Sequence, residues 1–235
     1  TYEMLKQVRP GIIYCKMSAY GDTGPYRNYR ANAQGIDVML GHASVRGYRD
    51  TDATSQPMSV AADPAEGVQA ALAIVAALHH RNLTGEGQLL DLCLAESFMS
   101  YMPQAFMDYA MNGSVQGTLG NRDPVAVPCG NFRCKGDDKW VSISIFSDEE
   151  WEGFCRAVGQ EWVYDDRFKD SLSRRRHEEE LERLVETWTQ QLDHYDAMHL
   201  LQKEGVAAGP VLNEAEAYQD PQLKARGFFV EESQE

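Results

Sequence analysis

Asp63 is the residue whose setting in this sequence best suits chemistry. It follows the small apolar residues 60–62 and precedes Pro64, a residue favoured at the first position of a helix. This pattern predicts that Asp63 caps an apolar helix. There the partial positive charge of the helix and its free N–H groups favour an ionised, nucleophilic carboxylate. From these local features alone, an ordinary helix cap is the favoured interpretation.

Other common chemistries find no support in the residue pattern. The sequence has no phosphate-binding glycine loop, no dinucleotide-binding glycine motif, no HExxH zinc motif and no GxSxG motif. His79 and His80 lie in an apolar segment and His194 and His199 in a charged one, without further ligands at metal-site spacing. A structural role is therefore favoured for these histidines, and no metal is expected.

Composition and charge narrow the class of protein and its partners. The chain has 235 residues, 43% of them apolar and 25% charged, which is typical of a soluble globular protein. Its 22 basic and 36 acidic residues give a formal charge of −14, so we expect neither nucleic acid nor an anionic membrane as partner. Five cysteines without a CxxC pair argue against a disulfide framework. No segment has the length of a membrane span, and the expected location is cytoplasmic.

The apolar pattern predicts the elements that hold Asp63. A strand at 11–18 is followed by a Gly/Pro-rich loop at 19–26, the kind of place where α/β folds bind ligands. Apolar residues on most faces of the segment 65–80 predict a helix that is buried on more than one side. The other elements expected in this half are two helices and a short buried strand, at residues 31–44, 95–111 and 89–94.

The pattern changes after residues 117–129, which contain two glycines and two prolines and are predicted to form a linker. Residues 130–134 and 140–146 predict a β-hairpin. Ser147 and Glu150 form a capping box for a helix that reaches about Val158. Two further helices, at 173–192 and 194–204, precede a short apolar segment at 206–211.

Several motifs together resemble the family III coenzyme A transferases. The first three blocks, in the family's order, are Tyr20-Gly21-Asp22-Thr23-Gly24-Pro25-Tyr26-Arg27, Ala62-Asp63, and Thr84-Gly85-Glu86-Gly87-Gln88. Further matches are Gly120-Asn121-Arg122, the segment 206–211 and the segment 220–229. Three spaced blocks are specific where one would not be, and the resemblance extends over nearly the whole chain.

The resemblance implies an α/β fold. Residues 1–116 would be part of a Rossmann-like large domain with the catalytic Asp, 117–129 a linker, 130–211 a small α+β domain, and 212–235 a return linker. Members of the family are longer and form interlocked homodimers. We therefore expect that an N-terminal segment with much of the coenzyme A pocket, and the extreme C-terminal part, lie outside this chain.

The resemblance also implies a mechanism and a set of site residues. Asp63 would attack an acyl-CoA to give a mixed anhydride and then an aspartyl-CoA thioester, with a small carboxylic acid as second substrate and no tightly bound cofactor. Arg30 falls near a position that meets coenzyme A in some relatives, and Asn32 is expected to hydrogen-bond an acyl or carboxylate oxygen. Gly120 and Asn121 lie in a loop that contributes to oxyanion stabilisation in the family.

Two alternatives stay open at this point. The superfamily includes α-methylacyl-CoA racemases, which pair the Asp with a His; the residue here is Asn32 by one alignment and Ile36 by another. Neither can shuttle a proton, so transfer is the favoured reaction. A catalytically inactive member is the second alternative. Oxalate is a poor first guess for the acceptor, because Asn121-Arg122-Asp123-Pro124 stands where formyl-CoA:oxalate transferases have consecutive glycines.

Overall fold

The computed structural model describes residues 1–52, 55, 59 and 61–232. The chain divides into two compact units, Thr1–Gly120 and Asn121–Glu235. The first unit has parallel strands joined by a helix, and the second has an antiparallel sheet with helices. The chain is therefore an α/β protein, as the sequence predicts; the exact bounds of the predicted linkers stay a prediction.

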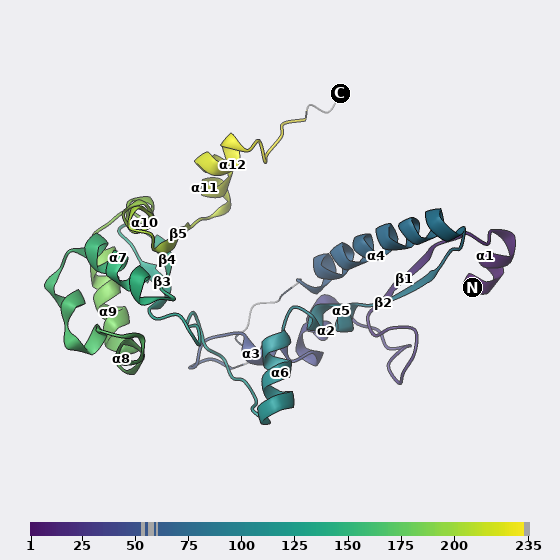
Figure 1. Cartoon of the computed structure of the whole chain (residues 1–235), viewed down its shortest axis with the longest axis horizontal. Helices are drawn as coiled ribbons and strands as arrows, with labels where there is room; N and C mark the ends of the chain where they lie inside the picture. Colours follow the sequence, from purple (N-terminus) through teal and green to yellow (C-terminus); the bar gives the residue numbers. More distant parts are fainter. Residues whose placement is uncertain (53–54, 56–58, 60, 233–235) are drawn as a thin grey trace. The chain divides into compact units, whose positions relative to one another are not determined.

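The sheet of the first unit consists of β1 (Tyr14–Ser18) and β2 (Leu89–Cys93), which run parallel. Helix α4 (Ala62–Thr84) connects them and lies along both strands, as Figure 1 shows. In such a crossover the helix runs back against the strands. The carboxyl ends of β1 and β2 and the N-terminus of α4 therefore meet at the same edge of the sheet.

The start of α4 differs from the prediction. Its N-cap is Ala61, so Asp63 is the second helical residue and not the cap. Ala62 is buried in a small apolar cluster with Ile36, Leu94 and Phe98, and this packing accounts for the helix beginning ahead of Asp63. Asp63 still lies in the first turn, where the helix dipole favours negative charge.

The predicted burial of this helix on more than one side is wrong for the described chain. Ala70 and Ala77 are buried, whereas Val68, Leu72 and Val75 are exposed. The helix packs on its own two strands and on α2 and α5, and the side chains of Val68, Leu72 and Val75 lie outside these contacts. The small side chains of the buried positions allow α4 to lie close to the sheet.

The shorter helices of the first unit are α1 (Tyr2–Val8), α2 (Ala33–Met39), α3 (His42–Val45), α5 (Leu94–Met99) and α6 (Pro103–Asn112). Two single helices predicted from the sequence are each divided. The one at 95–111 is interrupted before Pro103, because proline disfavours helical backbone at the preceding residue. The one at 31–44 is interrupted at Gly41, whose φ of 78° lies in the left-handed region.

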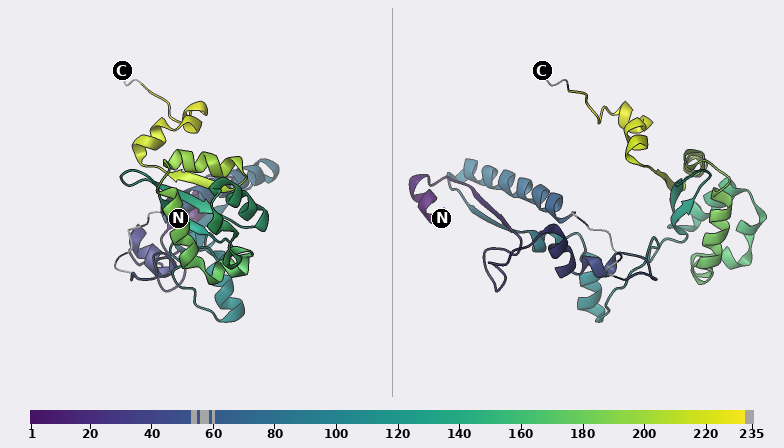
Figure 2. Two further views of the ribbon diagram at one scale, coloured as in Figure 1. Left: turned by 90° about the vertical axis from the view of Figure 1, so that its left-hand side faces the viewer. Right: turned by 180° about the vertical axis from the view of Figure 1, so that it is seen from behind.

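The predicted hairpin of the second unit is confirmed. Strands β3 (Cys129–Arg133) and β4 (Trp140–Ser144) pair antiparallel. A third strand, β5 (Ala207–Val211), pairs with β4, so the segment expected only as an apolar return completes the sheet. Figures 1 and 2 show the green helices of this unit around its sheet; α9 packs on β3, and α10 packs on β4 and β5.

The capping box of Ser147 and Glu150 is confirmed at the start of α7 (Asp148–Val158). The single helix predicted at 173–192 is divided, because the backbone of His177 leaves the helical region at φ −113° and ψ 25°. The other helical elements are η2 (Glu161–Tyr164), η3 (Asp166–Phe168), α8 (Ser171–Arg176), α9 (Glu178–Thr189), α10 (His194–Lys203), α11 (Glu214–Gln219) and α12 (Pro221–Ala225).

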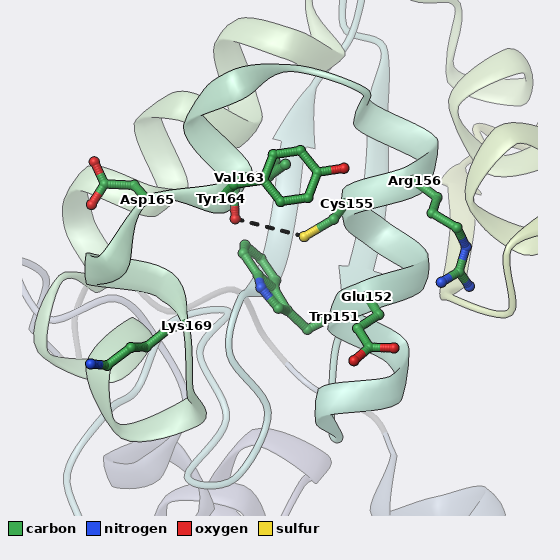
Figure 3. Close-up of a pocket in the computed structure, with 8 residues that line it drawn as sticks. All are labelled: Trp151, Glu152, Cys155, Arg156, Val163, Tyr164, Asp165 and Lys169. Atoms are coloured by element: carbon green, nitrogen blue, oxygen red, sulfur yellow. Dashed lines mark hydrogen bonds between the residues drawn. The ribbon is translucent and has the colours of Figure 1, made fainter.

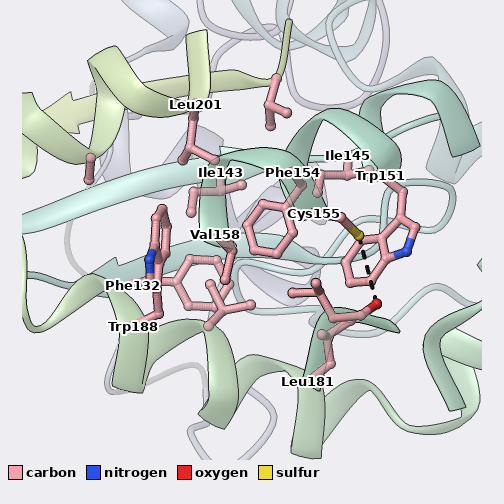
Figure 4. Close-up of a cluster of buried hydrophobic side chains, with 14 of the residues drawn as sticks. Phe132, Ile143, Ile145, Trp151, Phe154, Cys155, Val158, Leu181, Trp188 and Leu201 are labelled. Carbon is pink, nitrogen blue, oxygen red and sulfur yellow. Dashed lines mark hydrogen bonds between the residues drawn. The ribbon is translucent and has the colours of Figure 1, made fainter. Parts of the chain in front are cut away.

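A continuous apolar core fills the second unit (Figure 4). Phe154 lies at its centre, with ring centroids 5.3 Å from Trp151 and 6.0 Å from Trp188. Arg174 is only 1% exposed, and its guanidinium donates to Phe168 O at 3.2 Å and to Asp148 Oδ1 at 2.8 Å. Because these acceptors compensate for the lost water, the buried charge is tolerated at the border of the core.

Candidate active site

A cavity of about 290 Å³ opens beside the first turn of α4. It lies at the carboxyl end of β1, where α/β proteins place their ligand sites. Four segments contribute to its wall: the end of β1, the loop that leads into α2, the first turns of α4 and the residue after β2. The lining residues are Met17, Ser18, Ala19, Ala31, Asn32, Ala33, Ile36, Asp63, Glu66 and Leu94.

Asp63 contributes an exposed side chain to this cavity. Asp63 lies in the first turn of a 23-residue helix, so its carboxylate is close to the partial positive charge at the helix N-terminus. An accessible anion at the edge of a cavity is the arrangement that nucleophilic attack requires, because the incoming carbonyl must approach one of its oxygens.

Glu66 is a second carboxyl group in the same cavity, and the sequence analysis missed it. It lies three residues after Asp63, so the two side chains share one face of α4. Glu66 is only 5% exposed, and its Oε1 has no hydrogen-bond partner among the described residues. Burial, and to a lesser extent the Asp63 carboxylate, raises the pKa of Glu66. No local pattern in the sequence marked Glu66, because its burial results from tertiary packing.

Asn32 also lines this cavity, so the structure brings two of the predicted site residues together. Its Oδ1 accepts a hydrogen bond of 2.7 Å from the N–H of Gly35, and it thereby caps α2. Ile36, the residue that takes the place of Asn32 in the second alignment, is buried in the same wall. Both alignments therefore lead to this cavity, and both put a side chain that does not ionise near Asp63.

The other three predicted residues do not belong to the lining of this cavity. Arg30 is exposed in the loop just before the lining residues. Gly120 closes a turn: its φ is 66°, its N–H donates to Gly47 O at 2.9 Å, and a Cβ atom there would lie 3.0 Å from the Tyr48 ring. Glycine is favoured at position 120 because other residues are strained at this positive φ and a side chain would crowd the Tyr48 ring. Asn121 belongs to the second unit.

A neighbouring cavity of about 330 Å³ lies under the loop that follows β1. Gly21 and Gly24 each have a φ of 81°, which gives the Gly/Pro cluster its sharp turns. The backbone N–H of Asp22 donates to Asp91 Oδ2 at 3.3 Å, which fixes the loop to β2. The carboxyl edge of the sheet thus carries two cavities within the first unit.

The second unit has a cavity of about 390 Å³, lined mainly by α7 and η2 (Figure 3). Its nucleophile by residue type is Cys155, whose Sγ donates to Val163 O at 3.7 Å. Burial raises the pKa of this thiol to about 11, so it is protonated at neutral pH and is a poor nucleophile. The cavity that Asp63 lines is the better candidate for catalysis.

Within the described residues 1–52, 55, 59 and 61–232, no cluster of three or more His, Cys, Asp or Glu side chains could hold a metal ion. Over the same residues, no helix combines the length and the apolar composition needed to cross a membrane.

Comparison with known proteins identifies the family. The model of CoA-transferase family III matches residues 1–235. The chain belongs to this family. It is 30% identical over 237 residues to the succinyl-CoA:mesaconate CoA-transferase of Haloarcula hispanica, with 99% of this chain and 59% of that protein covered. It is 29% identical over 230 residues to the succinyl-CoA–D-citramalate CoA-transferase of Chloroflexus aurantiacus, with 97% of this chain and 57% of that protein covered.

Solved structures agree with the family. A CaiB/BaiF family protein from Brucella suis superposes with a TM-score of 0.84 at 30% identity, covering 97% of this chain and 60% of that protein. The protein Rv3272 from Mycobacterium tuberculosis gives a TM-score of 0.80 at 21% identity over 96% of this chain and 59% of that protein. The chain spans less than two thirds of the length of these relatives.

Proposed function

We propose that the protein transfers coenzyme A from an acyl-CoA to a carboxylic acid and that Asp63 is its nucleophile. The observation that carries this proposal is an exposed carboxylate in the first turn of α4, at the edge of a cavity at the carboxyl end of β1. Membership of CoA-transferase family III supplies the class of reaction.

The proposed reaction balances without an external acid, base or oxidant. The Asp63 carboxylate attacks the thioester carbonyl, the C–S bond breaks, and the CoA thiolate leaves behind a mixed anhydride. The thiolate then attacks the Asp63 carbonyl carbon, which releases the donor acid and forms an aspartyl-CoA thioester. The acceptor carboxylate repeats these two steps in reverse and regenerates Asp63. Covalent catalysis divides one difficult exchange into easier ones.

A dicarboxylic acid is the acceptor class that we propose. The names of three curated relatives contain mesaconate, glutarate and D-citramalate, each together with succinyl-CoA or succinate. A further relative, from Acetobacter aceti and 28% identical, is named for acetyl-CoA and oxalate. These relatives are named for short acyl groups and small di-acids, so succinyl-CoA and these acids are the substrates to try first.

The remaining site residues keep the roles that the resemblance implies, as parts of the proposal. Asn32, in the cavity wall, would donate its side-chain amide N–H to a substrate oxygen while its Oδ1 caps α2. The exposed Arg30 would meet the phosphates of coenzyme A, for which a protein of charge −14 needs local positive charge. Gly120 and Asn121 would contribute to the oxyanion site. A cytoplasmic homodimer without a tightly bound cofactor completes the proposal.

Racemisation is the less favoured reaction on geometric grounds. A two-base racemase needs proton carriers on opposite faces of an α-carbon. The ionisable side chains in the wall of the described cavity are Asp63 and Glu66, one helical turn apart on the same face of α4. Two acids on one face would approach a bound substrate from the same side. Proton exchange at the α-carbon without any acceptor acid would favour the racemase instead.

The test is intact-mass spectrometry of the protein as it is made in the cell, after addition of succinyl-CoA. We expect an aspartyl-CoA adduct, which hydroxylamine converts to a hydroxamate on the peptide that contains Asp63. The Asp63→Ala variant should form no adduct, and Asp22→Ala, which removes an exposed acid outside this cavity, should form it normally. Unmodified protein with every acyl-CoA tried, from a folded sample that binds coenzyme A, would refute the proposal.

A further inference from the structure

Glu66 is the ionisable group of the Asp63 cavity for which the proposed reaction has no use. Only 5% of Glu66 is exposed, yet the residue lines the cavity. Its Oε1 is shielded from solvent and has no hydrogen-bond partner among the described residues. Burying a carboxyl oxygen without a hydrogen-bond partner destabilises the fold. A bound ligand can remove this penalty by supplying the missing hydrogen bond.

The surroundings of Glu66 favour its neutral form. Its two causes of a raised pKa act in the same direction: burial disfavours the charged form, and the Asp63 carboxylate adds like charge one turn away. Glu66 also interacts electrostatically with the Cys93 thiol at the end of β2, whose pKa is raised by burial, so that this neighbour is uncharged at neutral pH. A neutral carboxylic acid has an O–H that can donate into the cavity.

We propose that Glu66 is a substrate-binding residue, whose neutral carboxyl group donates a hydrogen bond to the carboxylate of the acceptor acid in the Asp63 cavity. This inference rests on the proposed function. The acceptor acid then binds in the same cavity as the nucleophile, with Glu66 as its hydrogen-bond donor.

The charge of the cavity explains why an acceptor anion binds there at the right stage. In the free enzyme Asp63 supplies one negative charge, and a second carboxylate is repelled. In the aspartyl-CoA thioester Asp63 is neutral, and the acceptor carboxylate becomes the single anion. Glu66 therefore has one anionic neighbour at either stage, and such a neighbour favours the protonated form of its carboxyl group. A hydrogen bond from a neutral acid to a carboxylate is charge-assisted and stronger than one between neutral groups.

The spacing and a second donor support the same site. Side chains three residues apart on a helix have Cβ atoms about 5–6 Å from each other. An acceptor oxygen about 3–3.5 Å from the Asp63 carbonyl carbon therefore lies within reach of Glu66. Ser18, at the end of β1, lines the same cavity, and its buried Oγ also has no hydrogen-bond partner among the described residues. Two buried donors without partners are a suitable pair for the two oxygens of a carboxylate.

The test separates the two halves of the reaction in the protein as it is made in the cell. Succinyl-CoA is added first, and the aspartyl-CoA adduct is measured by intact mass. Glutarate, mesaconate or D-citramalate is then added over a range of concentrations, and the rate at which the adduct disappears is followed. The acid that discharges the wild-type adduct fastest serves for the variants.

Glu66→Ala should still form the adduct but need on the order of 10- to 100-fold more acceptor for half-maximal discharge, since a hydrogen bond to a charged group is lost. Glu66→Gln keeps an N–H donor of the same size and should restore half-saturation to within about threefold of wild type. Glu86→Gln, an exposed acid beyond the end of α4, is the matched control and should match wild type. Adduct formation itself shows that each variant is folded.

Three results would overturn the inference. Unchanged acceptor saturation in Glu66→Ala, with normal adduct formation, would mean that Glu66 does not touch the acceptor and would remove this inference alone. Equal losses in Glu66→Gln and Glu66→Ala would mean that its charge matters and not its donor. A wild-type protein that forms no adduct would remove the proposed function, and with it this inference.

Discussion

The two units of this chain differ in the size of their buried apolar clusters. The second unit buries a large apolar cluster that includes Phe154, Trp151 and Trp188. The buried apolar cluster around the candidate site consists of Ile36, Ala62, Leu94 and Phe98, and several large apolar side chains of α4 are exposed. The candidate site is thus built from strand ends and a helix start, in the unit with the smaller described core.

Because the larger core and the candidate site lie in different units, stability and chemistry can be perturbed separately. All four tryptophans, Trp140, Trp151, Trp162 and Trp188, lie in the second unit. Tryptophan fluorescence therefore reports the unfolding of that unit, while the proposed aspartyl-CoA adduct would report the chemistry of the first. The following changes test the separation, in order of decreasing expected effect.

Replacing the proposed nucleophile should give the largest effect, and it should be confined to chemistry. We expect Asp63→Asn to lower turnover on the order of 10⁴-fold or more, because the covalent route is lost. The side chain is exposed, so the free energy of unfolding should change by less than about 1 kcal/mol. Steady-state turnover and a guanidinium titration measure the two quantities. Turnover within tenfold of wild type would exclude Asp63 as the nucleophile.

Removing a central ring should affect only the second unit. Phe154 is fully buried, and Phe154→Ala should lower the free energy of unfolding by about 3–5 kcal/mol, through lost burial and the cavity left behind. Tryptophan fluorescence in a guanidinium titration measures the loss. Phe146→Ala, at an exposed position, is the matched control and should stay within about 0.5 kcal/mol of wild type. A loss below about 1 kcal/mol for Phe154→Ala would contradict the cooperative core.

A core change in the first unit should be smaller in stability but should reach the chemistry. Ile36 is buried in the small cluster and lines the Asp63 cavity, and Ile36→Ala should cost about 2–3 kcal/mol and enlarge the cavity. Far-ultraviolet circular dichroism measures the loss, and the rate of adduct formation should fall as well. Val38→Ala, exposed on the same helix, is the control. An unchanged adduct rate in Ile36→Ala would separate this wall from the reaction.

The smallest effect concerns alkaline pH in the second unit. Burial raises the pKa of Cys134 and of Cys155 from 9.0 to about 11. Between pH 9 and pH 11 the unfolded chain loses these protons while the folded one keeps them, so stability falls as pH rises. By pH 10 each thiol should cost about 1 kcal/mol. Guanidinium titrations at pH 8 and pH 10 measure this, and the double Cys→Ala variant should lose less; an equal loss would exclude the thiols as its source.

Local patterns in the sequence predicted local structure well. The hairpin of β3 and β4 and the capping box of Ser147 and Glu150 depend on residues close together in the chain, and both are confirmed. The division of helices at Pro103 and His177 was missed, because the apolar period continues across each break. The start of α4 was misjudged because burial of Ala62, a tertiary effect, overrides the capping preference of Asp63.

The site was predicted in part. The type and setting of Asp63 drew attention to it, and the family resemblance added Asn32, which shares its cavity. Glu66 was missed because an acid inside a helix is most often solvated, and only its burial distinguishes it. That burial results from tertiary packing, so no local pattern could have revealed it.

The parallel pairing of β1 and β2 also affects the order in which the chain folds. Tyr14 pairs with Leu89, 75 positions later in the chain, whereas the hairpin in the second unit joins β3 to β4 through a short turn. Closing a long loop costs more entropy, and contacts distant in sequence form more slowly. The edge that carries Asp63 therefore exists only after β1 and β2 have paired across this long loop. When the whole chain refolds, we expect the cavity to be completed later than the hairpin of the second unit.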